Sequence, residues 1–449
     1  MLRLYNTLGR EIQEFIPITP GKVGMYSCGP TVYDYQHIGH MRRYVGDDIL
    51  MRVLKLNGYA VHHVMNITDV GHLVSDSDTG EDKMEKGAKK FGLSVWDIAK
   101  KFETQFKDSC ELLNITLPQD LMHATDYILE QIELVKQLEE KGFTYRTSDG
   151  IYFDTAKFPD YFKLSLQNPE DLKAGARVEM GEKKNVSDFA LWKFSPVGEK
   201  RQMEWESPWG AGFPGWHIEC SAMSMKALGA HFDIHTGGID HISIHHTNEI
   251  AQSEAATGEK FANYWVHHAF LTVEGQKMSK SLGNFYTVED VKNKGFDPMA
   301  LRYLYLQTHY RQEMNFTWEA LDAAQTALNK LRRHYLESKE GSSSLPGEFA
   351  SALNDDLNIS KALAIVWENV GSLTRADFVK IDDALGLELA SYQEEKVDVP
   401  EEVQKLLQER QRARENKDFA KSDELRDEIK KLGFEVEDTA TGNTVKKSS

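Results

Sequence analysis

The chain has 449 residues, of which 41% are hydrophobic and 27% are charged, and its formal net charge is −17 at pH 7. This composition is typical of a globular protein of two to four domains, and the negative charge argues against nucleic-acid binding by bulk electrostatics while allowing a shaped RNA partner. Since the sequence has no run of about 18 apolar residues, no apolar leader and only three widely separated cysteines, we expect a cytoplasmic protein with no membrane span and no disulfide framework.

The first predicted elements form a βαβ unit. Residues 23–27 read as a buried strand that ends at the small-residue turn 28–30, and the apolar residues of 39–56 recur at helical spacing. Residues 59–67 are β-branched and apolar enough for a second strand. Residues 37–40 then lie at the helix entrance, where backbone N–H groups and the helix dipole favour phosphate oxygens.

A highly charged stretch, residues 71–93, follows this unit, and we expect it to be a loop-like lid or an exposed insertion. Ser94 then reads as the cap of a helix whose inner face carries Ala99, Phe102, Phe106 and Cys110. That spacing makes Cys110 a core thiol rather than a metal ligand.

The second half of the sheet follows an insertion. A helix over 125–141 and a hairpin over 144–153 predict an α/β insertion, after which residues 212–220, a helix to Leu228 and a strand at 232–235 resume the sheet. From Asp297 onward amphipathic helices predict a bundle, with 341–344 as a flexible link. The predicted fold is α/β. It has a Rossmann-type parallel-sheet domain (1–114 and 206–296), an α/β insertion (115–205), a helical bundle (297–398) and a small C-terminal domain (399–449). The last is formed by helices at about 401–416 and 418–432 and a strand-turn element.

Four residues form a candidate metal site: Cys28, Cys220, His245 and Glu249. Cys28 closes a strand and Cys220 begins a helix, at positions that reach the same mouth of a parallel sheet. His245 and Glu249 are four residues apart, so in a helix they share one face. Two sulfurs, a nitrogen and an oxygen suit zinc, although the residues alone leave open that they are ordinary core side chains.

Two short motifs are suited to binding a triphosphate. In the first signature, residues 37–40, Gly39 allows a close approach, and the imidazoles of His37 and His40 are able to donate hydrogen bonds to phosphate. The second signature, Lys277 to Ser281, adds two lysines on a loop that is able to close over the phosphates and neutralise developing charge.

With these residues the chain resembles the class I aminoacyl-tRNA synthetases, whose two signatures it carries, and specifically the cysteinyl-tRNA synthetase family over nearly its full length. Further matching motifs are Cys28 to Asp34, Asn66 to Asp69, Gly215 to Cys220, Gly237 to Asp240 and Asn248 to Ser253.

The resemblance implies a function and a set of residue roles. The family ligates L-cysteine to tRNA(Cys) by forming cysteinyl-adenylate from ATP and Mg²⁺ and then transferring cysteine to the terminal adenosine, without editing. The resemblance also implies one zinc ion per chain, which is bound by the four residues of the candidate metal site and selects the substrate thiolate. It further implies a C-terminal anticodon-binding domain and a monomer. The implied catalytic residues are His37, His40, Lys277 and Lys280; the ATP site comprises Gly29, Thr31, His37, Gly39, His40, Asp240 and Lys280; and Thr68 and Trp216 bind the amino acid.

Three positions depart from the family pattern. Thr247 replaces a glutamate near the metal site, and Val445 replaces a tryptophan near the C-terminus. Residues 70–73, Val-Gly-His-Leu, stand where an acidic pair and a lysine are usual. The resemblance therefore implies no contacts for the residues at these positions.

Two other functions stay open at this point. A related enzyme class ligates cysteine to an amino sugar, although it lacks a full C-terminal anticodon unit, which residues 410–442 resemble. A non-catalytic relative that binds RNA or metal is the other alternative, and the intact signature residues argue against it.

Overall fold

The computed structural model describes residues 1–72, 82–168, 181–196, 198, 201–393, 400–439 and 442–447. The chain divides into two compact units, Met1–Ala390 and Ser391–Ser449. The domain divisions predicted within the first unit stay predictions.

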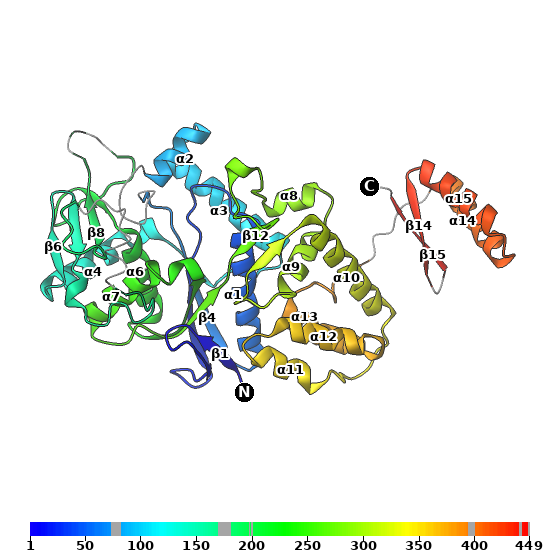
Figure 1. Cartoon of the computed structure of the whole chain (residues 1–449), viewed down its shortest axis with the longest axis horizontal. Helices are drawn as coiled ribbons and strands as arrows, with labels where there is room; N and C mark the ends of the chain where they lie inside the picture. The colour runs from blue at the N-terminus through cyan, green and yellow to red at the C-terminus, as the bar shows by residue number, and fades with distance from the viewer. Residues whose placement is uncertain are drawn as a thin grey trace. The chain divides into compact units, whose positions relative to one another are not determined.

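A five-stranded parallel sheet lies in the first unit (Figure 1). Each neighbouring pair of strands is parallel. The sheet joins segments from distant parts of the sequence, which confirms the predicted α/β fold with two separated halves of one sheet. In spatial order the strands are β11 (Ala262–His268), β10 (Phe232–Gly238), β3 (Lys22–Ser27), β4 (Ala60–Ile67) and β5 (Asp120–His123).

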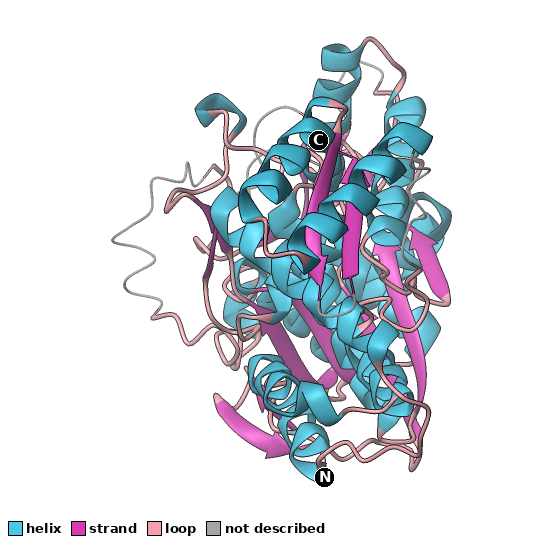
Figure 2. Cartoon of the chain, turned by 90° about the vertical axis from the view of Figure 1, so that its right-hand side faces the viewer, coloured by secondary structure: helices cyan, strands magenta, loops and turns pink. Residues whose placement is uncertain are grey.

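Helices flank the strands of this sheet (Figure 2). Successive side chains of a strand point to opposite faces, so Met25 joins one hydrophobic cluster and Tyr26 the other. The first cluster contains residues of α1 (Ile38–Leu56) and α3 (Val95–Leu112), and the second contains residues of α6 (Trp216–Leu228) and α7 (His245–Thr257). Cys110 is fully buried in the first cluster, as its spacing predicts.

The charged stretch after β4 contains a helix, so the prediction of a loop over all of 71–93 is wrong. Helix α2 (Lys83–Phe91) begins after Asp82, whose carboxylate accepts hydrogen bonds from the backbone N–H groups of Met84 (2.7 Å) and Glu85 (3.1 Å). Its buried face is short, consisting of Met84, Gly87 and Ala88. Because lysines surround so narrow an apolar stripe, the sequence shows no clear helical periodicity there. Residues 73–81 of the predicted lid lie outside the described residues.

In the sequence, a separate four-stranded antiparallel sheet is inserted between the two halves of the parallel sheet. The hairpin predicted over 144–153 is present as β6 and β7, which pair in antiparallel register. After α4 (Ile128–Glu140), the strands are β6 (Thr144–Arg146), β7 (Gly150–Phe153), β8 (Phe189–Phe194) and β9 (Gly212–Pro214).

Helices dominate the remainder of the first unit, as predicted from Asp297 onward. Residues 341–344, expected to be a flexible link, include Ser343 and Ser344, which donate hydrogen bonds to Asp377 Oδ1 at 2.7 and 2.8 Å. The elements are α8 (Val288–Asn293), α9 (Pro298–Leu306), α10 (Trp318–Glu337), α11 (Gly347–Asn354), α12 (Ile359–Asn369) and α13 (Arg375–Leu385), with the paired strands β1 (Arg3–Asn6) and β2 (Glu11–Glu14), and β12 (Leu271–Val273) and β13 (Met314–Phe316).

The second unit contains the expected helical pair and strand-turn element. Helices α14 (Glu401–Glu415) and α15 (Phe419–Lys431) are followed by the antiparallel strands β14 (Phe434–Thr439) and β15 (Gly442–Lys447). Val403, Ile429, Phe434 and Val436 form its small core.

Candidate functional site

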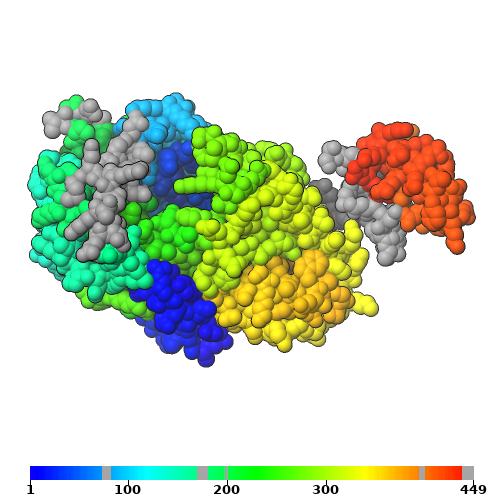
Figure 3. Space-filling model, viewed as in Figure 1, coloured from blue at the N-terminus to red at the C-terminus, as the bar shows by residue number. Residues whose placement is uncertain are grey.

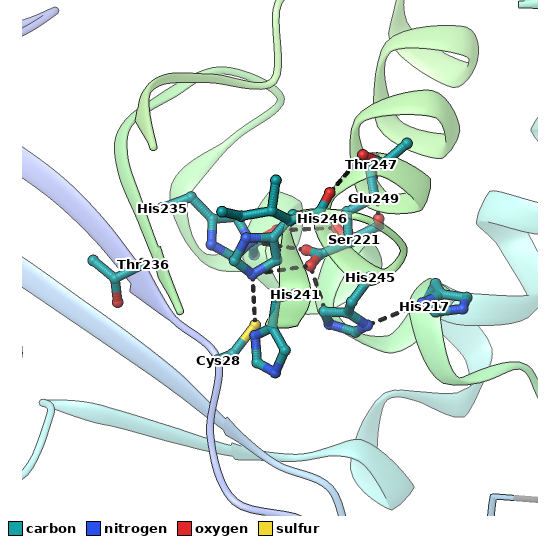
Figure 4. A network of polar contacts seen from close by, with 12 residues as sticks. Cys28, His217, Ser221, His235, Thr236, His241, His245, His246, Thr247 and Glu249 are labelled. Atoms are coloured by element: carbon teal, nitrogen blue, oxygen red, sulfur yellow. Dashed lines mark hydrogen bonds and ion pairs between the residues drawn. The ribbon is translucent and has the colours of Figure 1, made fainter. Parts of the chain in front are cut away.

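The four predicted metal-binding residues come together beyond the carboxyl end of the sheet. Cys28 directly follows β3, Cys220 lies in the second turn of α6, and His245 and Glu249 lie one turn apart on α7. One ligand atom from each lies within 4.8 Å of the other three, and all four residues are buried. Figure 4 shows Cys28, His245 and Glu249 pointing toward one another.

Further imidazoles surround this cluster. His246 Nε2 lies 3.2 Å from the sulfur of Cys28, and His235 Nε2 lies 2.8 Å from Glu249 Oε2. With Cys28 and Glu249, these two histidines make a second group of four close ligand atoms. On the other side of its ring, His246 Nδ1 is 2.8 Å from His267 Nε2. The sequence does not predict these contacts, because His235 is one of several histidines in strands and only the register of the sheet brings it to α7.

The electrostatics of the cluster favour one ionised thiol. Burial opposes ionisation of Cys28, yet a hydrogen bond with Cys220 and the imidazoles of His246 and His245 outweigh it, so the pKa of Cys28 is lowered. For Cys220, burial and the neighbouring Cys28 act in the same direction and raise the pKa. Cys28 is therefore the more readily ionised thiol.

The donor set fits a zinc ion. Zinc favours thiolate and imidazole ligands together with carboxylate oxygen. Glu249 Oε1 is buried and accepts no hydrogen bond from the described residues, although His245 Nε2 lies only 3.1 Å away. A buried carboxylate oxygen is costly unless a donor or a cation satisfies it, so this oxygen is suited to binding a metal.

Trp216 and Thr68 lie beside the residues of the cluster. Trp216 is the first residue of α6, and its ring centroid lies 4.5 Å from that of His245. Thr68 follows β4 and is buried; its hydroxyl donates to Glu219 Oε2 (3.0 Å) and accepts from Asn66 Nδ2 (2.9 Å). The structure thus brings both predicted amino-acid-binding residues toward the cluster.

One residue of the departure at 70–73, His72, lies beside Thr68 and Glu219. His72 is buried, and its Nε2 lies 2.5 Å from Glu219 Oε1. An acidic pair and a lysine occur later in the sequence, at residues 81–83. Lys83 N donates to the carbonyl of His72 (2.8 Å). Arg201 donates to the carbonyl of Gly71 (3.2 Å) and pairs with Asp82. The first residues of α2 therefore lie beside residues 71 and 72.

The first signature forms the entrance of α1. His37 caps the helix: its Nδ1 accepts from the backbone N–H of His40 (3.2 Å), and His40 Nδ1 accepts from the N–H of His37 (3.4 Å). Their rings stack with centroids 3.5 Å apart. Burial lowers the pKa of His37 to about 4, so its ring is neutral at pH 7. With Nδ1 accepting, the ring proton of a neutral imidazole lies on Nε2, where it is available to a phosphate oxygen.

The second signature lies directly over the first. A methyl group added to Gly39 would lie 2.7 Å from Met278 Cε and 3.0 Å from the His37 ring. Lys280 pairs with Asp34, and its ammonium lies 4.7 Å from the centroid of Phe285. Lys277 is exposed on the same loop. Glycine at position 39 is thus what allows the two signatures to pack together.

The other residues predicted to bind ATP have different surroundings. Gly29 packs so closely that an added methyl would lie 1.5 Å from the carbonyl oxygen of Asn66, and its N–H already donates to Asn66 Oδ1 (2.6 Å). Thr31 forms a parallel bridge with Thr68. Asp240 is exposed just beyond the end of β10. Gly29 and Thr31 therefore shape the backbone of the site, while the exposed Asp240 lies 3.8 Å from the Nε2 of His241.

Helix α1 connects the signatures to the metal-binding cluster. Arg43, three residues after His40, donates a hydrogen bond to the carbonyl of Cys28. The departure at Thr247 does not disturb the cluster, because its hydroxyl donates to the carbonyl of Ile242 (2.7 Å). Val445 lies within β15.

Comparisons with known proteins show the family of the chain. Residues 14–326 match the model of the class I (C) tRNA synthetase catalytic domain, and residues 396–445 match the cysteinyl-tRNA ligase anticodon binding domain. The chain is 51% identical to cysteine–tRNA ligase 1 of Burkholderia lata, covering 98% of this chain and 96% of the relative. It is 44% identical to cysteine–tRNA ligase of Treponema denticola, covering 99% of each.

A solved structure shares the fold. Mycobacterium tuberculosis methionyl-tRNA synthetase in complex with methionyl-adenylate aligns over 82% of this chain and 89% of its own, with a TM-score of 0.58 and 16% identity. Among the described residues, no helix is both long enough and apolar enough to cross a membrane. The sequence relatives and both domain models show that the chain belongs to the cysteine–tRNA ligase family of class I aminoacyl-tRNA synthetases.

Proposed function

We propose that this enzyme activates L-cysteine with ATP and transfers it to tRNA(Cys). The observation that carries the proposal is the buried group of Cys28, Cys220, His245 and Glu249, joined through Arg43 to the helix that begins at the first signature. A soft metal site beside a triphosphate site is suited to recognising a thiol substrate while its carboxylate is activated.

The proposed first step is a displacement at the α-phosphorus of ATP. A carboxylate oxygen of cysteine forms a bond to this phosphorus while the bond to the bridging oxygen breaks, and the electron pair leaves with pyrophosphate. The neutral His37 ring donates from Nε2, and Lys277 and Lys280 neutralise charge on the phosphates, which Mg²⁺ accompanies. The protein contributes positioning and electrostatic stabilisation rather than a covalent intermediate.

Thr68, Trp216 and Asp240 position the amino acid. Because the Thr68 hydroxyl donates to Glu219 and accepts from Asn66, its remaining lone pair favours a donor such as the substrate ammonium. Trp216 covers the side of the cluster at His245 and shields the bound substrate from water. Asp240 is exposed at the end of β10, where it would face the adenosine or the ammonium.

Zinc bound by Cys28, Cys220, His245 and Glu249 would supply a soft Lewis acid that binds a thiolate far better than a hydroxyl. An apolar pocket alone discriminates poorly against so close an analogue, typically by about 100-fold. Selection by the metal site therefore makes a separate editing reaction unnecessary.

In the second step, a hydroxyl of the terminal adenosine of tRNA attacks the carbonyl carbon of the adenylate, forming an ester and releasing AMP. The match of residues 396–445 to an anticodon binding domain favours tRNA over an amino sugar as acceptor. We propose that the enzyme acts as a cytoplasmic monomer with one zinc ion per chain.

Charging of tRNA(Cys) with labelled cysteine tests this proposal. Cysteinyl-tRNA should form only with ATP and Mg²⁺, and an amino sugar should not replace the tRNA. Formation of a cysteinyl amino sugar instead would establish the alternative acceptor, and no cysteine activation with either acceptor would refute the enzymatic proposal.

A further inference from the structure

Two lysines from distant parts of the sequence meet at one carboxylate beside the first signature. Lys90, at the end of α2, places Nζ 3.3 Å from Asp34 Oδ2. Lys280, of the second signature, pairs with the same oxygen. The other oxygen of Asp34 accepts from the N–H of Tyr35 (2.9 Å). Asp34 thus holds together two cations, of which only Lys280 belongs to a signature.

The position of Lys90 is fixed by the packing of α2. Gly87 lies so close to the backbone of Tyr33 that an added methyl would be 2.8 Å from its carbonyl oxygen. One turn later, Phe91 packs edge-on against the ring of Tyr35, with centroids 6.3 Å apart. Contacts on both sides of Asp34 therefore hold the last turn of the helix against this segment. Since residues three apart share a helix face, Lys90 follows Gly87 onto Asp34.

The meeting point lies next to the residues that handle phosphate. Lys280 lies over Phe285, whose ring contacts the His37 ring with centroids 5.2 Å apart. Figure 3 shows the light blue surface of α2 and α3 near the green surface of the second signature, with darker blue surface in the hollow between them. A polyphosphate in this hollow would be within reach of lysines from both sides.

The charge balance favours an anionic ligand. Partial burial alone would raise the pKa of Asp34, but the hydrogen bond from Lys280 and the charges of both lysines lower it, so the carboxylate is ionised at neutral pH. One negative charge faces two positive charges. Lys90 and Lys280 are about half exposed, with 49% and 42% of their side chains accessible, so they are able to turn from Asp34 to a ligand.

We propose that Lys90 and Lys280 form a binding subsite for the β- and γ-phosphates of ATP and for the departing pyrophosphate, and that Asp34 occupies both lysines until the nucleotide binds. The inference rests on the proposed cysteine activation. Lys90 adds a cation from α2 to those of the second signature. Asp34 acts as an internal competitor, which returns the lysines to their starting position when pyrophosphate leaves.

Binding of Mg²⁺-ATP and of Mg²⁺-pyrophosphate, measured by calorimetry on the full-length protein, tests the subsite. Lys90→Ala should weaken the binding of both by about five- to tenfold, as expected for one partly exposed charge-assisted contact. Lys90→Arg should largely retain binding, and Lys89→Ala, in the same turn of α2, is the matched control. Adenosine, which has no phosphate, should bind equally to every variant.

Asp34→Asn should change the affinity for ATP in the direction opposite to Lys90→Ala. Removing the competing charge should tighten ATP binding several-fold, whereas loss of a merely structural residue would weaken it. Unchanged ATP and pyrophosphate binding in Lys90→Ala would overturn the subsite, as would equal losses for adenosine. Unchanged or weaker ATP binding in Asp34→Asn would overturn the competitor role. Exchange of pyrophosphate into ATP by the wild-type protein tests the proposed function separately. If the wild type catalyses this exchange while Lys90→Ala binds ATP and pyrophosphate normally, the subsite is refuted and the proposed function is not.

Discussion

The hydroxyl of Thr68 donates a hydrogen bond to Glu219, with 3.0 Å between Oγ1 and Oε2. Glu219 directly precedes the metal-site residue Cys220 and also contacts the buried His72. The direction of this hydrogen bond determines what Thr68 is able to do, because a hydroxyl has a single proton. In the proposed function, Thr68 therefore acts toward the substrate as an acceptor.

Replacing Thr68 tests its role as an acceptor. Thr68→Ala should raise the KM for cysteine in pyrophosphate exchange by about tenfold or more, since hydrogen bonds to charged groups contribute about 1.5–3 kcal/mol. The KM for ATP should change little. Thr68→Ser keeps the hydroxyl and is the control. If Ser and Ala variants have the same KM for cysteine, Thr68 does not contact the substrate through its hydroxyl.

Zinc content and activity should fall together when a sulfur ligand is lost. Cys220→Ser replaces a soft ligand with a poor one, so the purified protein should lose most of its zinc and its cysteine activation. Metal analysis and pyrophosphate exchange check the two effects, and Cys110→Ser, which changes a core thiol, should keep its zinc. Full activity in a zinc-free Cys220→Ser protein would refute metal-based recognition.

The close packing of the signatures predicts a steric effect at Gly39. Gly39→Ala would bring a methyl to 2.7 Å from Met278 Cε, which displaces the second signature from the first. The kcat of pyrophosphate exchange should fall by about tenfold or more, because misplaced catalytic groups lose their positioning effect. The double variant Gly39→Ala, Met278→Ala should recover part of the rate. No recovery would place the conflict at His37, 3.0 Å away, instead.

The lowered pKa of Asp377 predicts how the folding stability depends on pH. Burial would raise its pKa, but hydrogen bonds from Ser343, Thr374 and Ser344 outweigh this effect and lower the pKa to about 2. Relative to an ordinary value near 3.9, this shift corresponds to about 2 kcal/mol of folding stability. The contribution is complete above about pH 4 and is lost as the pH falls through 2.

The variant Asp377→Asn should therefore unfold more easily by about 2 kcal/mol at pH 7, and the difference should shrink as the pH approaches 2. Urea unfolding at several pH values measures it. Asp383→Asn, on the same helix, serves as a control for the loss of a charge. A difference between wild type and Asp377→Asn that does not depend on pH would show that ionisation of Asp377 does not stabilise the bundle.

Local patterns predicted much of the architecture. The β3–α1–β4 unit follows from apolar periodicity and turn residues, and the shared face of His245 and Glu249 follows from their spacing of four. The loop prediction for 83–91 is wrong because lysines mask the small apolar face of α2. Pattern alone did not decide between a zinc site and ordinary core residues, since a ligand set drawn from three segments depends on the tertiary fold.

Contacts between residues far apart in the chain could not be predicted from the sequence. Asp34 and Lys280 are 246 residues apart, and no local periodicity links them. His235 of β10 reaches Glu249 of α7, with 2.8 Å between Nε2 and Oε2, although the two residues lie in different elements. Such contacts depend on sheet register and helix packing, which are set by the whole core rather than by any one segment.

Zinc-dependent selection of cysteine is tested by the exchange of labelled pyrophosphate into ATP, with cysteine or serine as the amino acid and with or without a zinc chelator. We expect exchange with cysteine, little exchange with serine, loss of activity on chelation and recovery when zinc is restored. Equal exchange with serine, or cysteine-dependent exchange that persists after the zinc has been removed, would contradict zinc-dependent selection.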